Sequence, residues 1–264
     1  MSKSFNKWDS GEAYDSFMGR WSKLVAPEFL KWLNLPDHLS WLDIGCGTGV
    51  LSEAILDHCL PSELLSVDPA EAFLELAKER LPVGSRIMTG NASNIPVTDE
   101  KFDVITSGLA LNFFPDLQSA LAEMKRVTKP KGIVTAYVWE YPERIDFLRY
   151  FWDTVFQVDP ESLKLKEGIH FPACNAESLS ASFREAGLID IATNIIVIDT
   201  DFICFDDYWT PFFGGQGPAA GYLVSLSNEL QTEIRIQVRS KLPFEADGSI
   251  KMNAKALAIR GTLR

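Results

Sequence analysis

The sequence is poor in residues that bind metals or crosslink a chain. Its cysteines, Cys46, Cys59, Cys174 and Cys204, stand far apart without CxxC spacing, so neither a zinc site nor a disulfide framework is expected. Only three histidines occur, and no metal-ligand cluster is recognisable. We expect no bound metal.

Long apolar runs are also lacking. The first residues contain no apolar signal core, and no stretch of 18 apolar residues occurs, so no membrane span is expected and a reducing cytoplasm is the expected location. Internal repeats and Gly/Ser linkers are absent as well. The 264 residues therefore predict one domain rather than two joined by a linker.

Positive charge is scarce. Lys and Arg number 25 against 36 Asp and Glu, which gives a net charge of −11. Nucleic-acid binders need a basic face to replace phosphate counterions, so this balance disfavours a nucleic-acid partner without excluding a local basic patch. The oligomeric state is left open.

Aromatic residues are scarce in the middle of the chain. Only five of the 30 fall between residues 33 and 136, whereas residues 1–32 carry seven and residues 137–222 carry seventeen. The rich flanks either cover a binding site and shape an acceptor pocket, or fill a larger core.

What is present is an alternation of strand and helix patterns. Short apolar strands are expected at 41–44, 64–67, 86–89, 102–107 and 133–139, separated by amphipathic helices at 50–60, 70–81 and 116–127. This order predicts an α/β fold with a mostly parallel sheet, which binds ligands at the carboxyl ends of its strands. We also expect a helix over 13–33 broken near Pro27, a turn at 129–132 and a loop-rich segment at 206–221.

A glycine loop follows the first strand. It contains Gly45, Gly47 and Gly49, but no lysine follows it, which excludes a nucleotide triphosphate loop, and the third glycine of the dinucleotide pattern is replaced by Val50. Asp43 would place a carboxylate beside a pyrophosphate, which is unfavourable. S-adenosylmethionine has no phosphate and carries an ammonium and a sulfonium, so a carboxylate here favours that ligand.

The motifs around this loop resemble those of the seven-strand, Rossmann-like class I S-adenosylmethionine-dependent methyltransferases, particularly the small-molecule enzymes of quinone biosynthesis. The resemblance is firm over residues 38–141 and loose over 176–264. It rests on LDIGCGTG, SVDPA, GNASNIP, FDVITSGLALNFFPD and KPKGIVTAYVW, which occur in the family's order.

The resemblance implies a doubly wound, mostly parallel seven-stranded sheet whose last strand is antiparallel, with an N-terminal helical cap and late helical insertions. We expect a single domain over 1–264, with cap helices in 1–36, a cofactor-binding core in 37–141, cap or substrate-side insertions in 142–175 and 206–243, and the rest of the sheet in 176–205 and 244–264.

The resemblance also implies a set of residues that bind S-adenosylmethionine. The glycine loop would pack under the methionine part, Asp43 and Arg20 would lie near its amino and carboxylate groups, and Asp68 would accept from the ribose hydroxyls. Asn91 stands where the family usually has aspartate. The full expected set is Tyr14, Arg20, Asp43, Gly45, Gly47, Gly49, Asp68, Pro69, Asn91, Ala92, Ser107, Gly108 and Leu109.

Three residues are candidates for the methyl-accepting side. Asn112 follows the fourth strand and either contacts the acceptor or caps a turn. Glu140 ends the fifth strand and is either a base or a solvated carboxylate. His170 is the histidine best placed for acid–base work, with a surface role as its alternative.

The resemblance implies in-line methyl transfer to a small, largely apolar or aromatic acceptor. One alternative is an RNA or protein methyltransferase of the same fold, although a [DN]PP[YF] tetrad is absent after the fourth strand. Another is a non-catalytic cofactor-binding module.

Overall fold

The protein is described by a computed structural model over residues 15–141, 145–165, 169, 171, 174–215 and 217–264. Its strands are β1 (Ser40–Ile44), β2 (Glu63–Asp68), β3 (Arg86–Thr89), β4 (Phe102–Thr106), β5 (Thr128–Trp139), β6 (Ile189–Asp199) and β7 (Asn253–Thr262). Its α-helices are α2 (Arg20–Leu33), α3 (Val50–Cys59), α4 (Glu71–Arg80), α5 (Leu117–Val127), α6 (Asp146–Val158), α8 (Ala176–Glu185), α9 (Phe205–Trp209), α10 (Gly217–Ser225) and α11 (Asn228–Lys241). Short helical turns occupy Asp15–Gly19, Leu111–Phe113, Pro160–Leu165 and Thr210–Gly214.

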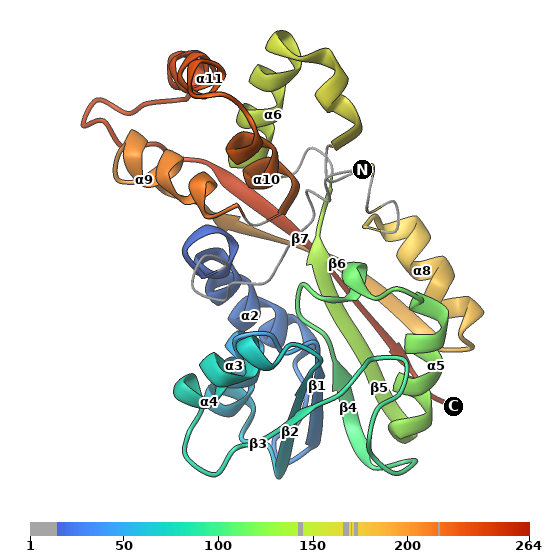
Figure 1. The fold of residues 1–264 in the computed structure, drawn as a ribbon. Helices are drawn as coiled ribbons and strands as arrows, with labels where there is room; N and C mark the ends of the chain where they lie inside the picture. The colour runs from blue at the N-terminus through green and yellow to red at the C-terminus, as the bar shows by residue number, and fades with distance from the viewer. Residues whose placement is uncertain (1–14, 142–144, 166–168, 170, 172–173, 216) are drawn as a thin grey trace. The chain divides into compact units, whose positions relative to one another are not determined.

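The seven strands form one sheet in the order β3-β2-β1-β4-β5-β7-β6 (Figure 1). Strands β3, β2, β1, β4 and β5 pair in parallel with their neighbours. Strand β7 runs antiparallel, since Glu140 near the end of β5 pairs with Lys255 near the start of β7, while Thr135, earlier in β5, pairs with the later Ile259. The predicted fold class, with its antiparallel last strand, is confirmed.

Helices cover both faces of the sheet, with α2, α3 and α4 on one side and α5 and α8 on the other (Figure 1). All five residues of β1 are buried because this strand lies in the middle of a sheet covered on both faces. Polar side-chain caps begin α5 and α8: Asp116 accepts from the backbone N–H of Ser119 at α5, and Asn175 does the same for Ser178 at α8.

The chain divides into two compact units. The sheet unit comprises Ser22–Val138, Ala173–Ile196 and Ala256–Arg264, and the helical unit comprises Met1–Trp21, Trp139–Pro172 and Val197–Lys255. The predicted cofactor-binding core falls almost wholly in the sheet unit, and the predicted insertions supply most of the helical unit. The single-domain division itself stays a prediction.

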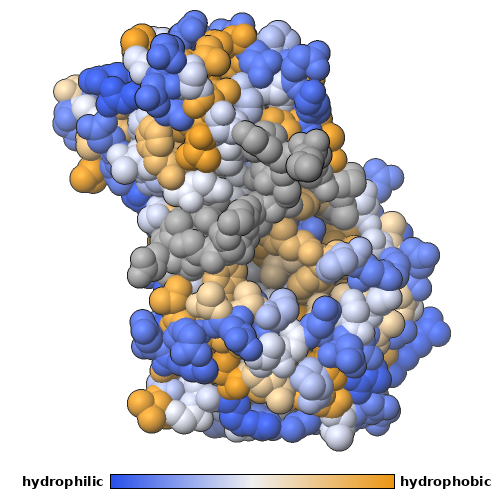
Figure 2. Space-filling view, viewed as in Figure 1, coloured by the Kyte–Doolittle hydropathy of each residue, from blue (hydrophilic) through white to orange (hydrophobic). Residues whose placement is uncertain are grey.

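Aromatic rings fill the core of the helical unit. Phe212 lies 4.8 Å from Phe151 and 5.0 Å from Phe17 between ring centroids, and Trp21 lies 5.2 Å from Phe202. All five are buried. These contacts favour the core-filling interpretation of the aromatic flanks for these residues. In Figure 2 most of the coloured surface is hydrophilic, with smaller hydrophobic areas over both units.

Three local expectations are wrong. Helix α2 continues through Pro27, because flanking residues such as Val25 and Phe29 are fully buried and their packing outweighs the lost backbone hydrogen bond. Residues 129–132 form a bulge inside β5, opposite Asp103, rather than a turn before it. Most of the segment 206–221 is helical, because its apolar side chains pack into the aromatic core.

Candidate functional site

The predicted cofactor-binding loops gather at one edge of the sheet unit. Strands β1, β2, β3 and β4 are parallel, so their carboxyl ends share that edge. The loop from Gly45 to Gly49 follows β1, Asp68 ends β2, and Ser107 follows β4 directly. Segments that are far apart in the sequence thus meet where α/β sheets bind their ligands.

The glycines of the loop have different roles. Gly45 has a φ of +69°, and an added Cβ would lie 2.6 Å from the Cβ of Ala110, so backbone packing requires glycine there. Gly47 has a φ of +54°, but an added Cβ would meet nothing within 4 Å. Gly47 therefore borders open space at the tip of the loop, as a ligand-binding glycine would.

Asp68 ties the loop to β2. One of its carboxylate oxygens accepts from the Gly47 N–H at 2.9 Å and the other from the Ala70 N–H at 2.8 Å. Burial raises the pKa of Asp68, and these two hydrogen bonds oppose that rise. Each oxygen keeps a second lone pair, so the carboxylate can still accept from a diol.

Asp43 is fully buried next to the carboxyl end of β1. Its Oδ2 accepts from the Ser52 hydroxyl at 2.7 Å, whereas its Oδ1 has no hydrogen-bond partner within the part of the chain that the structure describes. Burial raises the pKa of Asp43 to about 7, with a smaller contribution from the charge of Asp68. A buried carboxylate oxygen without a partner is a costly arrangement that a bound cation would relieve.

The segments after β3 and β4 complete the edge. Asn91 is exposed and its Oδ1 accepts from the backbone N–H of Ser93 at 2.9 Å, while Ala92 is buried. Ser107 is buried, and its hydroxyl has no partner among the described residues. Gly108 allows Tyr137 to approach, because an added Cβ would lie 2.7 Å from the tyrosine hydroxyl. Leu109, Pro69 and the loop glycines lie in these same segments.

The side chains and glycines at this edge fit S-adenosylmethionine. A buried carboxylate with an unpartnered oxygen suits a cationic amino group, Asp68 at the next strand end suits a ribose diol, and Gly47, whose N–H donates to Asp68, borders open space. The predicted roles of these residues stay predictions.

Five predicted residues are not placed at this edge. Asn112 lies in the sheet unit, half-buried in the turn Leu111–Phe113. Arg20 belongs to the helical unit and forms an ion pair with Asp207 at 2.8 Å. Glu140 is also in the helical unit, where its backbone N–H donates to Lys255. Tyr14 and His170 lie outside the described residues.

Sequence reasoning missed Ser52 and Ser66. Both are buried, and their hydroxyl oxygens lie 2.7 Å apart, next to Asp43. The available signal was a single serine on the otherwise apolar inner face of α3. Without knowing which strand α3 covers, that serine could not be linked to Asp43.

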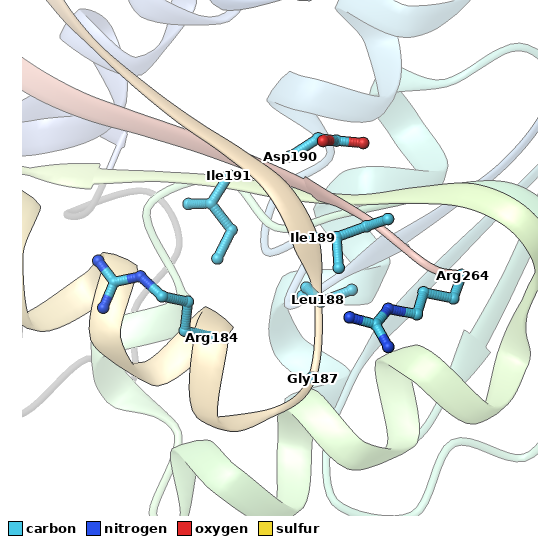
Figure 3. A pocket seen from close by; sticks show the side chains of 7 residues that line it. All are labelled: Arg184, Gly187, Leu188, Ile189, Asp190, Ile191 and Arg264. Atoms are coloured by element: carbon cyan, nitrogen blue, oxygen red, sulfur yellow. The ribbon is translucent and has the colours of Figure 1, made fainter.

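A separate pocket of about 580 Å³ lies at the edge strand β6 (Figure 3). The side chains of Arg184, Ile191 and Arg264 are among those that line it, and it contains none of the predicted site residues. Among the described residues, no group of three His, Cys, Asp or Glu side chains is arranged to hold a metal ion. In the same residues, no helix is long and apolar enough to span a membrane.

The seven-stranded sheet and the loops at its carboxyl edge define a Rossmann-like methyltransferase fold. Residues 42–136 match the family model described as a methyltransferase domain. A demethylmenaquinone methyltransferase of Geobacillus sp. is 32% identical over 179 residues, covering 61% of this chain and 76% of that protein. The corresponding Bacillus licheniformis protein is 29% identical over 204 residues, covering 72% and 86%. The chain therefore belongs to the class I S-adenosylmethionine-dependent methyltransferases and resembles those of quinone biosynthesis.

Solved structures show the same fold. The YcgJ protein of Bacillus subtilis aligns with a TM-score of 0.55 at 21% identity, over 93% of this chain and 99% of that one. A phosphoethanolamine N-methyltransferase of Haemonchus contortus, solved with S-adenosyl-L-methionine, aligns with a TM-score of 0.56 at 16% identity, over 96% of this chain and 56% of that one.

Proposed function

We propose that the enzyme transfers a methyl group from S-adenosylmethionine to a small, largely apolar or aromatic acceptor of the quinol type. The observation that carries the acceptor class is the similarity to proteins named demethylmenaquinone methyltransferase. The net charge of −11 supports a small molecule over RNA.

The residues at the sheet edge have separate tasks in this proposal. Bound S-adenosylmethionine supplies an activated methyl group on its sulfonium. The open space at Gly47 receives the cofactor, Asp43 attracts its amino group and Asp68 orients its ribose. The protein's main contribution is then alignment of the acceptor with the methyl group and exclusion of water.

Further residues are proposed for the methyl-accepting side. Asn112 lies in the turn Leu111–Phe113, which follows β4 in the chain, and we propose that it contacts the acceptor. Glu140 and His170 remain candidates for proton removal, which is needed only if the acceptor must lose a proton. We also propose that Tyr14 and Arg20 close over the cofactor and that no metal takes part.

A transfer assay tests this function. The protein is incubated with tritiated S-adenosylmethionine and, in separate reactions, with reduced naphthoquinones with and without an isoprenoid tail, with RNA and with denatured protein. We expect label only in the quinol fractions and its loss in Asp68→Asn. The exposed-site variant Asp57→Asn on α3 is the matched control. Label in RNA or protein alone would overturn the acceptor class, and absence of cofactor binding would indicate a non-catalytic role.

A further inference from the structure

Three polar side chains meet inside the sheet unit, beneath the predicted cofactor edge. Asp43 on β1 and Ser66 on β2 are paired residues of neighbouring parallel strands, so both side chains point to the same face. Ser52 on α3 covers that face, and its hydroxyl oxygen lies 2.7 Å from Asp43 Oδ2 and 2.7 Å from the Ser66 hydroxyl. All three residues are at most 1% exposed.

The direction of these hydrogen bonds follows from the charge of Asp43. An ionised carboxylate only accepts, so the single hydroxyl proton of Ser52 goes to Asp43. Ser66 must then donate to Ser52. The chain of donors ends on Oδ2, and Oδ1 of Asp43 has no partner among the described residues.

We propose that Ser52 is a positioning residue: its hydroxyl holds Oδ2 of Asp43, so that Oδ1 is presented to the cationic amino group of S-adenosylmethionine. The proposal rests on the proposed function, since it assumes that Asp43 receives that group. It assigns a task to a helix residue that does not itself contact the ligand.

Holding the carboxylate also keeps it charged. The Ser52 hydrogen bonds lower the pKa of Asp43, while burial and the nearby Asp68 charge raise it. The Cys46 thiol also lies near Asp43, and it stays neutral because burial raises its pKa well above the usual value. Without the Ser52 hydroxyl, Asp43 should be largely protonated near neutral pH and should attract a cation poorly.

Binding measurements on Ser52→Ala test the proposal. Affinities for S-adenosylmethionine and for methylthioadenosine, which lacks the amino-acid part, are measured by calorimetry from about pH 6 to about pH 8, where the ligand's amino group keeps much of its charge. If the pKa of Asp43 rises by about one from about 7, its ionised fraction falls about tenfold at pH 6, about fivefold at pH 7 and about twofold at pH 8. We expect the affinity for S-adenosylmethionine to fall in that proportion, and no change for methylthioadenosine. Ser182→Ala, a helical serine on α8 of the same unit, is the matched control and should match the wild type.

Two further variants keep the test independent of folding. Ser52→Thr retains the hydroxyl and should restore the wild-type pH profile. Ser66→Ala leaves the bond to Asp43 in place and should give a smaller loss with the same pH dependence. Unchanged S-adenosylmethionine affinity in Ser52→Ala, or equal weakening of both ligands at every pH, would overturn the inference alone. If the wild-type protein does not bind S-adenosylmethionine, the proposed function fails and the inference fails with it.

Discussion

The buried carboxylate of Asp43 predicts that the ligand-free protein is more stable when that charge is removed. Its pKa rises from 3.8 to about 7 on folding, so the native state binds this proton more tightly than the unfolded chain does. The stability associated with Asp43 is therefore fully present below about pH 4 and is lost as the pH rises through about 7. The Asp43→Asn variant carries no such titration.

The size of the effect follows from the difference in pKa. A difference of about 3 corresponds to about 4 kcal/mol over the whole pH range, and about 3 kcal/mol of it falls between pH 5 and pH 8. Because Asp43 is fully buried, solvent screening does not reduce this figure. The new amide group at the Oδ1 position costs about 1–3 kcal/mol if it finds no acceptor, but that cost is the same at both pH values.

The assay is urea unfolding of the wild type and Asp43→Asn at about pH 5 and about pH 8 without cofactor. The quantity of interest is the variant's free energy of unfolding minus that of the wild type. We expect this difference to become more favourable to the variant by about 3 kcal/mol at the higher pH. The exposed-site variant Asp57→Asn should show no such change. A difference for Asp43→Asn that is independent of pH would refute the reasoning.

Four further substitutions have defined outcomes. Asp68→Asn should weaken S-adenosylmethionine binding at least about tenfold in calorimetry, because it removes a charged acceptor of two backbone N–H groups; equal affinity would contradict its assignment. Gly45→Ala should lower the free energy of unfolding by more than about 2 kcal/mol because the new Cβ clashes with Ala110. Gly47→Ala should lower it by only about 1 kcal/mol but should impair cofactor binding. Urea melts and calorimetry measure these two effects, and equal destabilisation by both variants would contradict the different roles assigned to the two glycines. Tyr208→Phe should cost about 1 kcal/mol in the same melts, because the buried hydroxyl donates to a carbonyl of α6 at 2.9 Å; an unchanged melt would show that this bond contributes nothing.

Local sequence patterns were enough to predict much of the sheet unit. Strand β1 and helix α3 were predicted within a few residues, because an apolar run, a glycine loop and an amphipathic helix each signal their type locally. A glycine often ends a helix in the left-handed conformation, and Gly187 has a φ of +82° just after α8. The segment 206–221 was misjudged, since its glycines and prolines suggest loops while its aromatic side chains gain more by packing as helices.

The sequence by itself determined the class of the protein and the candidate cofactor residues. The pattern consists of the glycines at 45, 47 and 49 and the carboxylates Asp43 and Asp68. Their residue types and spacing indicate a cofactor-binding loop, and this can be recognised without knowing the fold. Only the tertiary structure decided what surrounds them. The link from Ser52 to Asp43 depends on which strand α3 covers, and the raised pKa of Asp43 depends on burial by segments distant in the chain. Ser52 and Asp43 are only nine residues apart, but their contact is set by how α3 packs on the sheet, which residue type and spacing do not encode.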